Sequence, residues 1–131
     1  IRWVGGEQFL AVGPSGHALV LDADRERNTG PGPMELLLLA LGGCTGADVV
    51  TILRKKRQQV RGIEIRLAGE RASEPPTVWK RLKVHYRITG KGLDPRAVEH
   101  ALELSRTKYC SVAATLKHTA AIEWSHSIEE G

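Results

Sequence analysis

The stretch PMELLLLALGGCTGADVVTILRKKR, residues 33–57, decides the fold of this chain. Residues 36–53 contain one charged side chain, Asp48, and their apolar side chains fall on every side of a helical wheel. Because a surface helix shows a polar face, we predict a long central helix that is surrounded by protein. Pro33 suits the first helical position, and Glu35 places a favourable negative charge in the first turn.

A membrane span is the alternative interpretation of this stretch. Its apolar part reaches the lower limit of a spanning length, but Asp48 and three glycines interrupt it. The segments on both sides have the pattern of amphipathic strands, so we expect a core helix and no membrane contact. The basic run at residues 54–57 falls at the expected helix end, where cations complement the helix dipole.

Composition limits the function classes. A chain of 131 residues suits one domain, 1–131, and 41% hydrophobic with 26% charged residues is typical of a globular protein. The net charge is +4, but basic and acidic residues alternate over most of the chain, which argues against a nucleic-acid-binding module. No signal peptide is visible, and two cysteines in such a chain favour a reducing compartment, so we predict a cytoplasmic protein.

The segments around the central helix predict an α+β fold. Residues 1–22 are interpreted as a small antiparallel meander of three strands, followed by a polar loop at residues 22–32. Residues 60–72 and 78–89 alternate apolar and polar side chains, as antiparallel strands with one solvated face do. Their apolar face is the natural cover for the central helix.

The last third of the chain predicts two helices and a strand. Asp94 and Pro95 form an N-cap and first-position pair, and the helix that they begin should end near Lys108. A short helix is expected at residues 112–116 and a strand at residues 120–128. This order favours antiparallel sheets packed around the central helix.

Two thiols are the candidates for chemistry. Cys44 lies within the apolar helix, where a free thiol often serves only as a small core side chain. The glycines at 42, 43 and 46 each cost about 1 kcal/mol of helix stability relative to Ala. Either access to the sulfur or close helix packing explains them. Cys110 comes just before an expected helix, whose N–H groups and dipole would stabilise a thiolate.

A reactive Cys44 requires a cation. Asp48 follows one helical turn later, on the same side, and its carboxylate would raise the pKa of the thiol. The helix supplies no basic residue near Cys44, so Arg25 and Arg27 in the preceding loop are the best local candidates. The five histidines have no ligand-like spacing and no cofactor motif is present, so we predict neither metal nor cofactor.

Three motifs together resemble the OsmC/Ohr family, and most of all its YhfA-like branch: PMEL at 33–36, GGC at 42–44 and YCSV at 109–112. The resemblance covers nearly the whole chain. It implies an OsmC-like fold in an intertwined homodimer, and a thiol-dependent peroxidase that reduces organic hydroperoxides under oxidative stress. It further implies that Cys44 is the peroxidatic thiol, that Cys110 is the resolving thiol, and that a dithiol reductant restores both.

The sequence departs from the family pattern around the thiols. Arg25 or Arg27 lies in the region of the family's activating arginine, without a diagnostic motif around it. Met34 occupies the place of the family's glutamate, and Glu35 stands next to it, about 13 Å from Cys44 along a straight helix. Glu35 would therefore act across a dimer interface or only as a charge at the helix start. The alternative function is a non-enzymatic member of the fold that holds an apolar ligand near Cys44.

Overall fold

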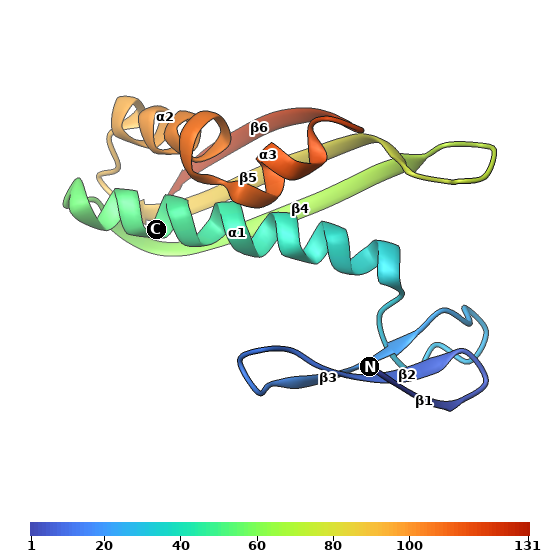
Figure 1. The fold of residues 1–131 in the computed structure, drawn as a ribbon. Helices are drawn as coiled ribbons and strands as arrows, with labels where there is room; N and C mark the ends of the chain where they lie inside the picture. Colours follow the sequence, from blue (N-terminus) through green and yellow to red (C-terminus); the bar gives the residue numbers. More distant parts are fainter. The chain divides into compact units, whose positions relative to one another are not determined.

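The computed structural model describes residues 1–131, which form two compact units, Ile1–Leu39 and Ala40–Gly131. The boundary between them falls inside the long helix α1, Pro33–Lys55 (Figure 1). Each unit has its own sheet, and we describe each by itself. The α+β class and the long helix at its predicted start are confirmed.

The N-terminal unit is the predicted meander. Strands β1 (Arg2–Gly5), β2 (Gln8–Val12) and β3 (Ala18–Asp22) pair in this order, antiparallel throughout. The buried Asp22 organises the following loop, because its carboxylate accepts hydrogen bonds from Thr29 and from the Asp24 amide. These bonds, led by the Thr29 hydroxyl, lower the pKa of Asp22.

The sheet of the second unit has β5 at its centre. Strand β4 (Gln59–Arg71) pairs antiparallel with β5 (Trp79–Lys91), and β6 (Ala121–Glu130) pairs with β5 in parallel. The sheet is therefore mixed, and the prediction of antiparallel sheets is wrong for this one pair. The parallel direction of β6 follows from its connection. The helical segment between β5 and β6 returns the chain to the end of the sheet at which β5 begins.

One face of this sheet forms the core. The side chains of β5 that were predicted to share an apolar face are all buried: Leu82, Val84, Tyr86 and Ile88. The opposite face is exposed, and there Arg87 pairs with Glu129 at 2.9 Å. The alternation of β5 therefore predicted its two faces correctly.

Helix α1 is buried along one face. Its buried residues in the second unit are Leu41, Gly42, Thr45, Val49 and Leu53. A Cβ added at Gly42 would lie 2.7 Å from Leu67, and one at Gly46 would lie 2.9 Å from Ile65, both on β4. These two glycines serve close helix packing, whereas Gly43 is exposed and has open space beside it.

The rest of α1 is only partly covered in one chain. In its most apolar stretch, mean hydropathy 2.0, 28% of the residues are buried, so the predicted all-round burial holds for one face only. By length and composition alone this helix would suffice to cross a membrane, a test that core helices of soluble proteins also pass.

The segment between β5 and β6 contains the second cysteine. Helix α2 (Pro95–Leu104) begins as predicted, with the Asp94 carboxylate accepting the Arg96 amide at 2.9 Å. It continues into one π-helical turn, η1 (Ser105–Tyr109), and then into α3 (Ser111–Leu116). Cys110 joins these two elements and caps α3.

Candidate active site

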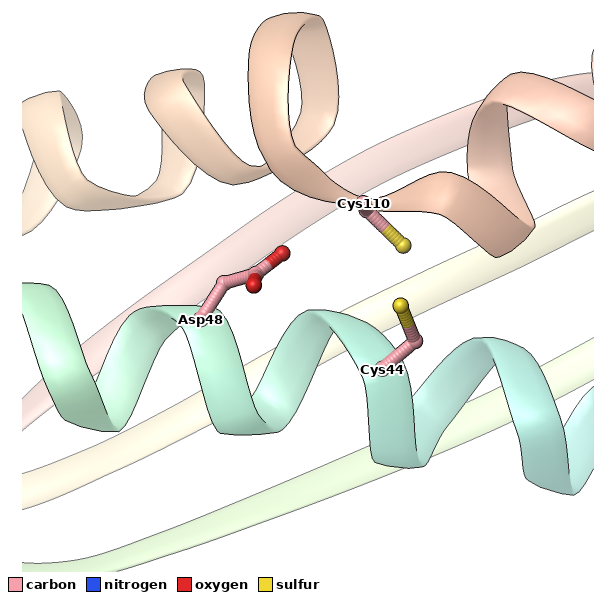
Figure 2. Close-up of side chains that lie close together, drawn as sticks. All are labelled: Cys44, Asp48 and Cys110. Carbon is pink, nitrogen blue, oxygen red and sulfur yellow. The ribbon is translucent and has the colours of Figure 1, made fainter.

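The two cysteines meet although they are far apart in the sequence. Cys44 projects from the middle of α1, Asp48 follows one turn later, and Cys110 faces both from the junction of η1 and α3 (Figure 2). The two sulfur atoms and one carboxylate oxygen of Asp48 all lie within 4.8 Å of one another. Both thiols are free; Cys44 is half-buried and Cys110 is 3% exposed.

Local hydrogen bonds place the Cys110 sulfur. The Cys110 amide donates to the Ser105 carbonyl oxygen at 2.8 Å, which closes the π-helical turn. Sγ accepts the Ala113 amide at 3.4 Å in the manner of an N-cap side chain. The turn η1 thus directs the sulfur of Cys110 toward α1.

The predicted thiolate stabilisation at Cys110 is wrong. The pKa of the Cys110 thiol is raised to about 11, mainly by burial and in smaller part by the neighbouring Cys44 and Asp48. The Ala113 amide acts in the opposite direction and is outweighed. A helix start favours an anion only where the group keeps enough solvation, and desolvation dominates here.

Asp48 stands at the end of a buried chain of hydroxyl groups. Its Oδ2 accepts a hydrogen bond of 2.9 Å from Ser105 Oγ, which lies 2.8 Å from Thr45 Oγ1. Thr45 Oγ1 lies 2.5 Å from the Tyr86 hydroxyl. Each hydroxyl has one proton to donate. Because Ser105 gives its proton to Asp48, Thr45 donates to Ser105 and Tyr86 donates to Thr45. Burial raises the pKa of Tyr86 to about 12, which keeps this first donor protonated.

The comparisons with known proteins agree with this fold. A family model described as OsmC-like protein matches residues 26–125, which include both cysteines and Asp48.

The chain belongs to the OsmC family.

Three relatives illustrate how this OsmC-family protein compares with others. Protein YhfA of Escherichia coli K12 is 41% identical over 129 residues, 98% of this chain and 94% of YhfA. The crystal structure of a hypothetical protein from Aquifex aeolicus VF5 is 32% identical with a TM-score of 0.89, covering 99% of this chain and 93% of that one. The organic hydroperoxide resistance protein OhrB of Bacillus subtilis is 15% identical with a TM-score of 0.61, covering 95% of this chain and 98% of OhrB, and so shows the fold alone.

The other predicted site residues of this OsmC-family protein lie in the N-terminal unit. The Glu35 carboxylate accepts a hydrogen bond of 3.1 Å from the Gly32 amide. Glu35 therefore acts at the start of α1, which is one of the two roles proposed for it. Arg25 and Arg27 belong to the loop after β3, where the Arg25 guanidinium lies beside the backbone of Gly32. The activation of Cys44 by either arginine stays a prediction.

Sequence reasoning missed the three hydroxyl residues of the site. Thr45 and Ser105 are fully buried, and Tyr86 was interpreted only as a core residue of β5. One signal was present in the sequence. A threonine beside Cys44 and a serine after the apolar residues of α2 are polar side chains at buried positions, and such groups need partners.

Thiolate sulfur and carboxylate oxygen atoms can also serve as ligands of thiophilic metal ions. A structural zinc site takes four protein ligands, and three side chains converge here, none of them a histidine. The geometry alone therefore favours a thiol pair beside a carboxylate over a closed metal site.

A cavity of about 470 Å³ adjoins the cluster at Asp48. Ile52, Leu104 and Tyr109 give it an apolar wall. Lys55 and His100 also line it and add basic groups. A small organic molecule with an apolar part fits such a space beside Asp48, which is the residue that the cavity shares with the thiol cluster.

Proposed function

We propose that this OsmC-family protein is a thiol-dependent peroxidase that reduces organic hydroperoxides through Cys44 and Cys110. The convergence of the two sulfurs with the Asp48 carboxylate, within 4.8 Å, carries this proposal. A disulfide between these two thiols requires their sulfur atoms to approach from within 4.8 Å to about 2.05 Å. The family relationship supports the same chemistry, because some structural neighbours are named organic hydroperoxide resistance proteins.

The exposure of the two thiols supports different roles for them, with Cys44 as the peroxidatic thiol and Cys110 as the resolving thiol. Cys44 is half-buried and reachable by substrate, whereas Cys110 is buried behind it. The Cys44 thiolate attacks the peroxide O–O bond, which releases an alcohol and leaves a sulfenic acid on Cys44. Cys110 then condenses with the sulfenic acid to form a disulfide and water. A dithiol reductant of the cytoplasm reopens this disulfide by exchange.

The cavity beside Asp48 supports the choice of an organic peroxide as substrate. Its apolar wall would hold the alkyl or aryl group of the hydroperoxide while the O–O bond meets Cys44. Hydrogen peroxide has no alkyl or aryl group, so it would gain no binding energy from the apolar wall. We therefore expect the rate constant for Cys44 oxidation to be higher with cumene hydroperoxide than with hydrogen peroxide.

A cation from the loop before α1 completes the proposed site. Arg25 or Arg27 would hold Cys44 as a thiolate, and Glu35 would orient that arginine across a homodimer interface. Arg25→Lys and Arg27→Lys keep the charge but remove the planar guanidinium. We expect one of these two variants to oxidise Cys44 at least about tenfold more slowly, as loss of activation does in thiol catalysis.

The same cavity favours the second candidate function, binding of an apolar ligand near Cys44 without turnover. The two functions differ in what happens to the thiols. Stopped-flow mixing of the reduced protein with cumene hydroperoxide should consume both thiols, and Cys44→Ser should abolish this loss. Equal and slow reaction of wild type and Cys44→Ser would exclude the peroxidase and leave the binding function.

A further inference from the structure

The resolving step of the proposed cycle lacks an obvious base. Thiolates are nucleophiles and neutral thiols are poor ones, yet Cys110 is buried and its pKa is raised to about 11. At neutral pH almost every Cys110 carries its proton. Disulfide formation therefore needs a group inside the site that takes this proton as the S–S bond forms.

Asp48 is placed to be that group. Its carboxylate lies within 4.8 Å of both sulfurs and faces the gap between them (Figure 2). Ser105 holds Oδ2 with a hydrogen bond of 2.9 Å, which fixes the carboxylate and leaves it further lone pairs for the thiols. The hydroxyl chain behind Ser105 only donates, so it orients the carboxylate and does not compete for the proton.

We propose that Asp48 is the acid–base residue of the resolving step and passes the Cys110 proton to the hydroxide that leaves Cys44. The Cys110 sulfur supplies the electron pair of the new S–S bond while the S–O bond of the Cys44 sulfenic acid breaks. Asp48 accepts the S–H proton and delivers it to the departing oxygen, which leaves as water. Sulfenic acid and thiol thus become disulfide and water, and Asp48 ends as the carboxylate that it was. The inference rests on the proposed function, since the hydroperoxide supplies the sulfenic acid.

The other titratable groups around Asp48 do not replace it. Tyr86 on β5 contacts it only through Thr45 and Ser105, and burial raises its pKa to about 12. Four further groups border the cavity that Asp48 also lines, Lys55, Lys56, His100 and Tyr109, and the exposed Arg106 on η1 interacts electrostatically with Tyr86. These side chains lie on the solvent-facing side of Asp48. Only the two thiols join the Asp48 carboxylate in the group of atoms within 4.8 Å of one another.

Asp48→Asn separates the two steps of the cycle. The amide oxygen can still accept the Ser105 hydrogen bond, but the amide takes no proton at neutral pH. Reduced protein is mixed with one equivalent of tert-butyl hydroperoxide in the presence of EDTA. Dimedone then traps the Cys44 sulfenic acid, and mass spectrometry follows the disulfide. We expect disulfide formation to slow about 100-fold, the lower end of general acid–base effects, while dimedone-trapped Cys44 accumulates.

The pH profile distinguishes acid–base chemistry from a structural role. In Asp48→Asn, solvent hydroxide must ionise Cys110, so the resolving rate should rise about tenfold per pH unit from pH 7 to 9. The wild-type rate should be flatter over this range. Should the amide variant fold poorly, Asp48→Ala with added formate tests the same point, and formate should restore resolution in proportion to its concentration.

Three controls assign each failure to its cause. Cys110→Ser with and without Asp48→Asn isolates the oxidation of Cys44, and because Asp48→Asn removes a negative charge beside this thiol, the double variant should react at least as fast as Cys110→Ser. Glu103→Gln removes an exposed charge on α2 and should leave both steps unchanged. Wild type that forms no sulfenic acid would overturn the proposed function itself. Normal sulfenic acid formation with wild-type resolution in Asp48→Asn would overturn the role of Asp48 alone.

Discussion

Asp48 is the one charged side chain in the apolar part of α1, and its partners explain how it is tolerated there. Ser105, Thr45 and Tyr86 supply a directed chain of hydroxyl donors that ends on its carboxylate. All three donors are buried. A carboxylate without such partners would be costly at this position, so the network fixes both the acid and the turn η1 that carries Ser105.

Removing Ser105 should therefore destabilise the protein. Ser105→Ala takes the donor from Asp48 and the acceptor from Thr45, and an unsatisfied buried polar group costs about 1–3 kcal/mol. Urea unfolding should show this loss in the free energy of unfolding. Thr115→Ala, which removes an exposed hydroxyl bonded to the Ser111 carbonyl oxygen, should change it by no more than about 0.5 kcal/mol. Equal losses in the two variants would contradict the network.

The raised pKa of Cys110 predicts its alkylation behaviour. In Cys44→Ser, the rate of Cys110 modification by iodoacetamide should have its midpoint well above pH 8.5 in the folded protein, because burial is the main cause of the raised pKa and only the thiolate reacts. In urea the same profile should have its midpoint near pH 8.5, the ordinary pKa of a thiol. A folded-state midpoint near pH 8.5 would show that burial does not hold Cys110 neutral.

At the scale of single residues, the sequence predicted the site in part. Cys44 and Asp48 share a helix, so their side-by-side placement follows from helical spacing. The approach of Cys110 came from the family resemblance. Ser105 and Tyr86 join the site only through tertiary packing, which the spacing of residues in a chain does not show.

At the scale of elements, two of the three glycines in the middle of α1 serve close packing. Gly42 and Gly46 face Leu67 and Ile65 on β4, so the helix approaches the sheet closely along this side. Gly43 faces open space. Close packing, one of the two explanations left open by the sequence, thus applies to Gly42 and Gly46, and access to the sulfur stays a prediction for Gly43.

This difference predicts that alanine substitutions at Gly43 and Gly42 change the free energy of unfolding by unequal amounts. Gly43→Ala should stabilise the protein by about 1 kcal/mol through helix propensity alone. Gly42→Ala should gain less, because Leu67 must move away from the new methyl group. Thermal or urea unfolding of both variants measures the contrast. The packing account fails if Gly42→Ala stabilises as much as Gly43→Ala does.

The sequence also predicted most elements, and the exceptions share a cause. Alternation located β4 and β5, and the Asp94–Pro95 pair located the start of α2. The parallel direction of β6 was not predicted, since a strand pattern is the same for either direction. The π-helical turn was also missed, because the hydrogen bond from the Cys110 amide to the Ser105 carbonyl oxygen leaves no mark in residue types.

At the scale of the whole molecule, α1 explains why we propose a homodimer. Leu37 and Leu39 are 37% and 53% exposed in the single chain, although the helix is apolar all round. Covering such side chains by a second copy is favourable at about 25 cal/mol for each Å² buried. The family resemblance implies the same assembly.

A charge on this surface tests the assembly. We expect sedimentation equilibrium to give a dimer for the wild type and a shift toward monomer for Leu39→Lys. Lys is costly in an apolar interface because its ammonium loses water there. His118→Lys, an exposed change beyond α3, should leave the dimer intact. A wild-type monomer at micromolar concentration would exclude the proposed dimer.

The central claim, that Cys44 and Cys110 act as one redox pair, has a direct test. Reduced protein is treated with one equivalent of cumene hydroperoxide, blocked with iodoacetamide, digested without reductant and analysed by mass spectrometry. The account predicts one species in which the peptides of Cys44 and Cys110 are joined by a disulfide within a single chain, and its loss after dithiothreitol. Two alkylated cysteines, or disulfides only between chains, would contradict it.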